Sequence, residues 1–191
     1  MSDSNTDVVA VSIWPTVWKY SIILAACSFA FTLVRYYTGL GASTGMGLLG
    51  LVIAIVVLVI ALKNYRGLNG GYMTFGTATL AAFMIDFLGS VISSTVNAVY
   101  LAFVDESILP AMTEKTMTQL QQTPGISKPA LDMMTGIYKN FVFTPGGMFI
   151  LGCVAGVIVG IILALILAAI LKKAPPITGW RNTFLVVSSD K

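Results

Sequence analysis

One acidic residue, Asp86, interrupts an otherwise uncharged stretch from Gly67 to Val104. Four polar residues follow it at a spacing that puts all five on one face of a helix: Ser90, Ser93, Ser94 and Asn97. A carboxylate inside a bilayer costs about 2.5–3.5 kcal/mol on insertion scales, and such a residue is by default a candidate for function. The stripe therefore predicts either a proton- or cation-binding group on a polar path, or a set of hydrogen bonds that join helices.

The sequence places no basic partner beside Asp86. It contains no histidine, and no lysine or arginine falls at mid-depth in an apolar segment. We therefore expect the carboxyl group to be protonated, or to accept hydrogen bonds from hydroxyl groups inside a helix bundle. A conduit usually has several ionisable groups or broken helices, so the structural interpretation stays open beside the transport one.

A second pattern lies in the last apolar segment, where small residues recur at every fourth position: Gly152, Gly156, Gly160, Ala164 and Ala168. This spacing lines them up on one face of a helix. Small side chains let two helix backbones approach closely, which drives helix association in membranes. The face is predicted to receive another helix of the same chain, or else a second copy or a subunit of a larger membrane complex.

The sequence lacks the patterns that would indicate catalysis or metal binding. It contains no GxSxG elbow, no phosphate-binding P-loop and no HExxH pair. The absence of histidine also removes the commonest general base and most zinc sites. Cys27 and Cys153 lie in different apolar segments and are interpreted as packing residues. We expect a protein that is not an enzyme and that uses no cofactor or metal.

The composition indicates which elements hold these residues. Of 191 residues, 57% are hydrophobic and only 10% are charged, whereas soluble domains are about 25% charged. Charge-poor windows long enough to cross a bilayer predict four helices, at about 17–37, 46–62, 75–103 and 144–171. The expected fold is an all-α integral membrane protein: a four-transmembrane-helix bundle in a single domain, 1–173, followed by a tail, 174–191.

The one long polar segment between the predicted spans covers 105–140. It predicts a helix over about 106–121, a break at Thr123–Gly125, and a shorter helix for which Ser127 can serve as the N-cap. Weak apolar stripes on both helices would lie against the membrane surface or against each other. We expect this segment to form a short helical cap outside the membrane.

Basic residues near the predicted helix ends are divided unequally between the two sides of the membrane. Five lie on the side shared by the termini, namely Lys19, Lys63, Arg66, Lys172 and Lys173, and two lie on the other, Arg35 and Lys139. The positive-inside rule then predicts a multi-pass protein of the bacterial inner membrane with both termini in the cytoplasm. Trp14, Trp18 and Trp180 fall on the cytoplasmic side and are predicted to be interfacial anchors.

The order of these features resembles a known family. A Lys63–Arg66 segment is followed by Gly70–Gly76, the third span ends at Ala102–Asp105, and Phe143–Phe149 precedes the small-residue helix, which closes with Ala168–Lys173. This order is similar to the bacterial membrane family called domain of unknown function 4199, found mostly in Bacteroidota. The resemblance covers about 15–173. It implies a four-helix inner-membrane protein and supplies no catalytic or ligand-binding residues.

Two functions are compatible with these observations. The first is a non-enzymatic scaffold or accessory subunit that acts through its helix faces and its periplasmic cap, embedded in the lipid bilayer. The alternative is a small transporter or channel in which Asp86 binds a proton or a cation. The net charge of +3 is too small and too scattered for a nucleic-acid partner.

Overall fold

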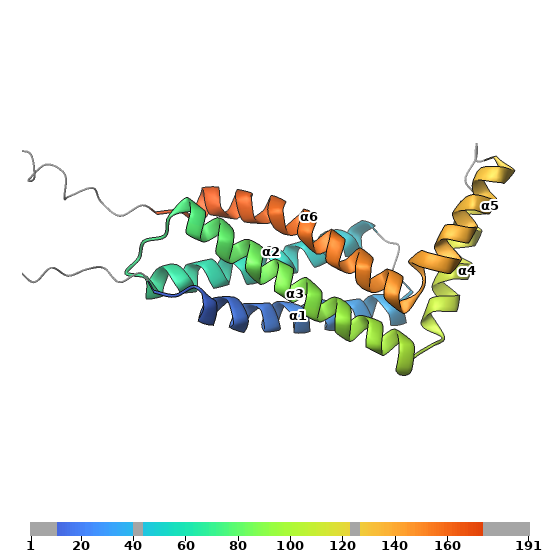
Figure 1. Ribbon diagram of the computed structural model, residues 1–191, viewed down its shortest axis with the longest axis horizontal. Helices are drawn as coiled ribbons and strands as arrows, with labels where there is room; N and C mark the ends of the chain where they lie inside the picture. The colour runs from blue at the N-terminus through green and yellow to red at the C-terminus, as the bar shows by residue number, and fades with distance from the viewer. Residues whose placement is uncertain (1–10, 40–43, 123–126, 174–191) are drawn as a thin grey trace, which may run out of the picture.

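The computed structural model describes residues 11–39, 44–122 and 127–173, and Figure 1 shows four long helices that run side by side. They are α1 (Trp14–Tyr37), α2 (Thr44–Leu68), α3 (Phe75–Phe103) and α6 (Pro145–Leu171). Each is long and apolar enough to cross a membrane. The prediction of an all-α membrane protein with four spans is therefore confirmed.

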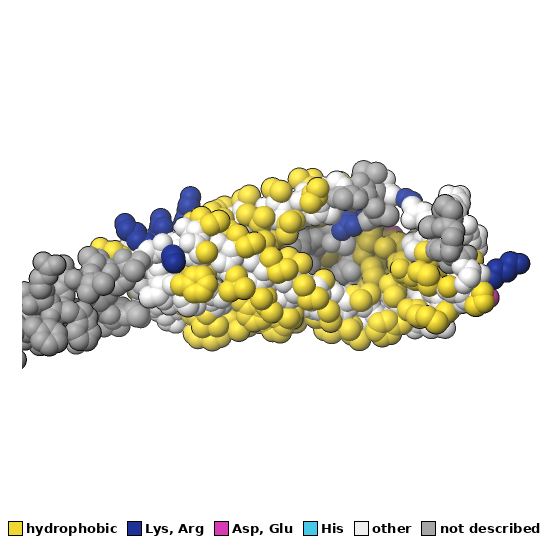
Figure 2. All heavy atoms as spheres, turned by 90° about the horizontal axis from the view of Figure 1, so that it is seen from above, with side chains coloured by type: hydrophobic (Ala, Val, Ile, Leu, Met, Phe, Trp, Pro, Cys, Tyr) yellow, Lys and Arg dark blue, Asp and Glu magenta, His cyan; other side chains and the backbone are white. Residues whose placement is uncertain are grey.

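The flanks of the long helices expose large apolar side chains. On α6, Ile158, Ile162 and Ile166 are about half exposed, whereas Gly160 and Ala164, which lie between them in the sequence, are buried. Figure 2 shows apolar side chains along the flank of the bundle, with Lys and Arg side chains gathered towards its ends. Such a belt is stable where lipid rather than water surrounds it.

The second long helix extends further than its apolar run. α2 continues to Leu68, beyond the expected end at residue 62, because the helix-breaking glycines come later. Gly70 and Gly71 both have positive φ, a conformation that other residues rarely adopt. The added turn places Tyr65 in the core, where it is 2% exposed.

The packed core occupies one half of the bundle. Its buried residues come from the first half of α1 and α3 and from the second half of α2 and α6, and include Val17, Leu58, Ala82 and Leu163. Because neighbouring helices alternate in direction, these halves meet at one end. We call this the closed end, where α2 and α6 finish and α3 begins. In the opposite half, α2 exposes Leu48, Leu49 and Val52.

Backbone hydrogen bonds fasten the closed end. Met73 and Lys173 exchange two of them, at 2.8 and 2.9 Å, which ties the start of α3 to the end of α6. The Arg66 guanidinium donates to the carbonyl of Leu171 at 3.3 Å. The hydroxyl of Thr74 caps α3 by accepting from the backbone N–H of Thr77. Segments separated by about a hundred residues are thus held together at this end.

Shorter helices cover the other end of the bundle, which we call the cap end. Figure 1 shows α4 (Ile108–Gln121) and α5 (Lys128–Ile137) lying at an angle across the ends of the long helices. A π-helical turn, η1 (Tyr138–Val142), leads from α5 into α6. The hydroxyl of Thr144 starts α6 by accepting from the backbone N–H of Gly147 at 3.0 Å.

Two details of the cap differ from expectation. Ser127 occupies the N-cap position of α5, but its side chain makes no capping hydrogen bond; a proline in the first turn favours the helical start there instead. The first cap helix begins at Ile108 rather than at 106, because Asp105 accepts hydrogen bonds from both the backbone and the hydroxyl of Ser107. The expected break at residues 123–125 lies outside the described residues.

Candidate functional site

The small-residue face of α6 lies against the polar stripe of α3. The facing pairs are Gly152 with Ser94, Gly156 with Ser90, and Gly160 with Asp86. A Cβ added at Gly160 would lie 2.7 Å from Oδ2 of Asp86, and one added at Gly156 would overlap the side chain of Ser90. The stripe and the small-residue face therefore form one interface inside the chain.

The remaining two small residues of α6 continue this face into the core. Ala164 and Ala168 are both fully buried among the core side chains of the closed end. The α6 face is thus occupied by residues of the same chain, from Gly152 beside Ser94 to the closed end. A partner protein would have to use another surface.

α3 also packs closely against α1. A Cβ added at Gly89 would lie 3.1 Å from Cδ2 of Leu24 and 3.3 Å from the carbonyl oxygen of Ser21. The buried hydroxyl of Ser21 donates to the carbonyl of Ile85 at 3.2 Å. The segment that carries Asp86 is therefore held between α1 and α6, with little room to move sideways.

Asp86 is buried, with 5% of its surface exposed. None of the described residues makes a hydrogen bond to its carboxyl group. A buried carboxyl without a donor or a cation beside it is costly when it is ionised. What adjoins it is a cavity rather than a partner side chain.

The cavity beside Asp86 has a volume of about 340 Å³, is lined by all four long helices and is open to the outside of the bundle along part of its wall, where Leu51 of α2 and Val159 of α6 are exposed. Its polar lining comes from hydroxyl groups of α1 and α3: Ser28, Ser90, Ser93 and Ser94. Small residues on the other helices leave the space open, among them Gly47, Gly50 and Ala54 of α2 and Gly152, Ala155 and Gly156 of α6. A space of this size with several hydroxyls can hold water.

Two further cavities adjoin this one in the direction of the cap end. The next, of about 280 Å³, shares Ser93, Ser94 and Gly152 with it and also touches Asn97. A third, of about 380 Å³, shares Arg35, Tyr36 and Met112 with the second and lies beside α4. The three cavities form a series from Asp86 to the cap end.

One hydrogen bond crosses the middle cavity. The hydroxyl of Tyr36 on α1 donates to Oδ1 of Asn97 on α3 at 3.2 Å. Both residues line this cavity, so the bond joins its two walls. Asn97, the last residue of the predicted stripe, thus contacts α1, whereas Ser90 and Ser94 face α6.

The charged groups of the series gather at its outer part. Arg35 lines both the second and the third cavity, and Lys115 and Asp105 line the third. Hydrogen bonds from Ser107 hold the pKa of the Asp105 carboxyl below its usual range, so this group is ionised at neutral pH. Asp86 is the one acidic residue on the described lining of the inner two cavities.

Several of the lining residues have no signal in the sequence. Tyr36, Ser28 and Gly50 are typical residues of membrane-spanning segments, and nothing in the sequence around them indicates a cavity. Only the folded arrangement brings them beside α3. The polar side chain of Tyr36, at the end of an apolar run, is the sequence signal that could have indicated the series of cavities. Among the described residues, no group of three Cys, Asp or Glu side chains is placed to hold a metal ion.

The predicted tryptophan anchors fall in two groups. Trp14 and Trp18 lie at the start of α1 at the closed end and are more than half exposed. This placement fits aromatic rings at a membrane interface. Trp180 lies outside the described residues. Cys27 is exposed on α1, and Cys153 is partly buried on α6.

Fold and site together define a multi-pass helical membrane protein with a polar interior beside the buried Asp86. The chain belongs to the family described as protein of unknown function DUF4199, whose profile matches residues 19–173. A search of curated proteins found no match. A search of solved structures also found none.

Proposed function

We propose that the protein is a small membrane transporter or channel in which Asp86 takes up and releases a proton. The observation that carries this proposal is the position of Asp86, buried at the inner end of a hydroxyl-lined series of cavities. An ionisable side chain in such a place is the usual mark of an ion or proton pathway in a membrane protein. A residue that only joined helices would need a partner, and no described residue bonds to it.

The lining of the inner cavities favours a proton over a metal cation. Asp86 is the only carboxyl group on the described lining of these cavities. A single carboxyl group can bind and release a proton, whereas a divalent cation would need several anionic or carbonyl oxygens.

The packed closed end must open if a proton bound at Asp86 is to cross the whole membrane. The packed core and the Met73–Lys173 bridge lie between Asp86 and that end. A proton bound from the cap end can leave on the other side only if this half loosens.

We place the protein in the bacterial inner membrane with both termini in the cytoplasm. The support is the unequal division of basic residues near the helix ends, five on the closed-end side and two on the cap side. In this orientation the series of cavities opens towards the periplasm, and α4 and α5 form a periplasmic cap.

A flux measurement tests the proposed function. Purified full-length protein is reconstituted into phospholipid vesicles that contain a pH-sensitive dye, and a pH gradient is imposed with potassium and valinomycin to balance charge. We expect the gradient to collapse faster than in protein-free vesicles, in proportion to the protein content. If the two kinds of vesicle relax at the same rate, with the gradient imposed in either direction, the transport proposal is wrong.

A scaffold or accessory role is the second candidate, and the cap favours it. Met133, Ile137 and Phe141 are exposed on α5 and the following turn, outside the membrane spans. Exposed apolar side chains on a water-facing segment indicate a surface for a partner or for the membrane. Under this role the protein needs no proton at Asp86, so its partner binding would survive replacement of that residue.

A further inference from the structure

The outermost cavity has the lining of a site for an amphiphile. It has a volume of about 380 Å³ and lies between the end of α1, the turn that follows α3, and α4. Ile108, Ala111 and Met112 give it an apolar wall, and polar and charged side chains complete it. Its position at the end of the apolar spans is where lipid head groups meet water.

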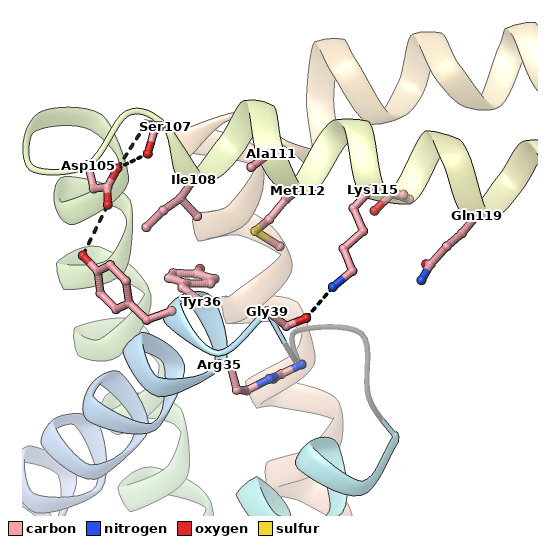
Figure 3. A pocket seen from close by; sticks show the side chains of 12 residues that line it. Arg35, Tyr36, Gly39, Asp105, Ser107, Ile108, Ala111, Met112, Lys115 and Gln119 are labelled. Atoms are coloured by element: carbon pink, nitrogen blue, oxygen red, sulfur yellow. Dashed lines mark hydrogen bonds between the residues drawn. The ribbon is translucent and has the colours of Figure 1, made fainter.

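Two cations from different helices reach the same part of this cavity. Figure 3 shows Arg35 of α1 and Lys115 of α4 extending towards the region of Gly39. The Lys115 ammonium donates to the Gly39 carbonyl, and it has three donors in all. Arg35 contributes a guanidinium, whose planar fork of N–H donors is the geometry that matches a phosphate.

Asp105, the one carboxylate on the described lining of this cavity, is held apart from the cations. Figure 3 shows Asp105 on the opposite side of the pocket. It accepts hydrogen bonds from the backbone and hydroxyl of Ser107 and from the hydroxyl of Tyr37 at 3.3 Å. These donors satisfy the Asp105 charge locally, so the end with Arg35 and Lys115 keeps its positive potential.

We propose that this cavity binds an anionic phosphate group, with Arg35 and Lys115 as its ligands. The apolar wall of Ile108, Ala111 and Met112 fits the glycerol and upper acyl chain of a phospholipid. Free inorganic phosphate offers an anionic phosphate group without the apolar part. This inference uses neither Asp86 nor the cavity beside it, but the site lies in the outermost cavity of the same series, so a bound phosphate group would lie at the entrance of the proposed proton path.

Native mass spectrometry of the delipidated full-length protein tests the inference. Phosphatidylglycerol, phosphatidylcholine and inorganic phosphate are titrated separately, and then inorganic phosphate is added against bound phosphatidylglycerol. We expect phosphatidylglycerol to bind about tenfold more tightly than phosphatidylcholine, and Lys115→Gln to weaken it about tenfold, since a charged hydrogen bond is lost. Lys115→Arg should retain binding, and so should Lys128→Gln, which removes an exposed cation of α5.

The competition arm identifies the source of the phosphate. If millimolar inorganic phosphate displaces phosphatidylglycerol, the site binds the free anion; if it does not, the lipid is the ligand. The proposal would be overturned if Lys115→Gln and Arg35→Gln bound each ligand, phosphatidylglycerol and inorganic phosphate, as tightly as the wild type does. If Arg35→Gln does not elute as the folded protein in size-exclusion chromatography, the test relies on Lys115→Gln alone. Lys115 is exposed on α4, so its replacement should not disturb folding.

Discussion

Replacing Asp86 with Asn should return proton flux in reconstituted vesicles to the rate of protein-free vesicles. Asn has nearly the same shape as Asp but cannot bind or release a proton in this pH range. The side chain is buried beside the cavity that all four helices line, so no other described carboxyl group there can take its place. The measurement is the rate of collapse of an imposed pH gradient.

Stability separates a specific effect from misfolding in this variant. Because a buried carboxyl is costly in a membrane, Asp86→Asn should melt at the same temperature as the wild type or higher. Asp132→Asn is the matched control, since it removes an exposed carboxyl of α5 that is on the described lining of none of the three cavities. Wild-type flux in Asp86→Asn would show that Asp86 is not the group that binds and releases the proton.

Placing isoleucine at Gly156 should weaken the bundle by about 1–3 kcal/mol, the usual cost of overpacking a close interface. Already the first side-chain carbon would overlap Ser90 across the α3–α6 contact. The two helices must then separate, which also deforms the wall of the Asp86 cavity. Thermal unfolding in detergent, followed by circular dichroism, measures the loss of stability.

Gly146→Ile provides the control for this change, because a Cβ at Gly146 meets no atom within 4 Å. It lies on the same helix and introduces the same β-branched side chain, so it reports the intrinsic cost of the substitution. If both variants melt at the same temperature, the close approach of α3 and α6 does not contribute to stability. A Gly156→Ile protein that keeps the wild-type melting temperature would lead to the same conclusion.

The spans and the two patterned faces could be predicted from the sequence because each depends on local periodicity. Asp86 and the serines that follow it share a face at helical spacing wherever the helix packs, and the same holds for Gly152, Gly156 and Gly160. That the two faces meet could not be predicted, because it depends on the rotation of α3 and α6 about their axes. Only the folded chain shows which residue of one faces which residue of the other.

The cavity could not be predicted for a related reason. It exists because small residues on four separate segments coincide in space, among them Ser28 of α1, Gly50 of α2 and Gly152 of α6. Each of them alone is an ordinary residue of a membrane helix. The Tyr36–Asn97 hydrogen bond likewise joins residues 61 positions apart. Contacts at such separations follow from helix packing, not from any local pattern.

The end of α2 shows where a local rule gave the wrong boundary. The first charged residue after the apolar run, Lys63, predicted the end of the span, yet the helix continues through it to Leu68. Charge marks where a helix leaves the lipid, whereas backbone conformation decides where it stops. The positive φ of Gly70 and Gly71 supplies that stop.

The central claim is that water reaches the inner cavity beside Asp86 from the cap end only. It is tested in a background without native thiols, Cys27→Ala and Cys153→Ala, with Ser93→Cys as the reporter, because Ser93 lines both inner cavities. Ala61→Cys, fully buried in the core, is the control. An impermeant, sulfonate-bearing methanethiosulfonate is added to intact spheroplasts and, separately, to inverted vesicles.

We predict modification of Ser93→Cys in spheroplasts, none in inverted vesicles, and none of Ala61→Cys in either preparation. Modification in inverted vesicles alone would reverse the proposed orientation but leave the cavity in place. Absence of modification in both preparations, or equal modification from both sides, would contradict the claim that Asp86 lies at the inner end of a path open to one side.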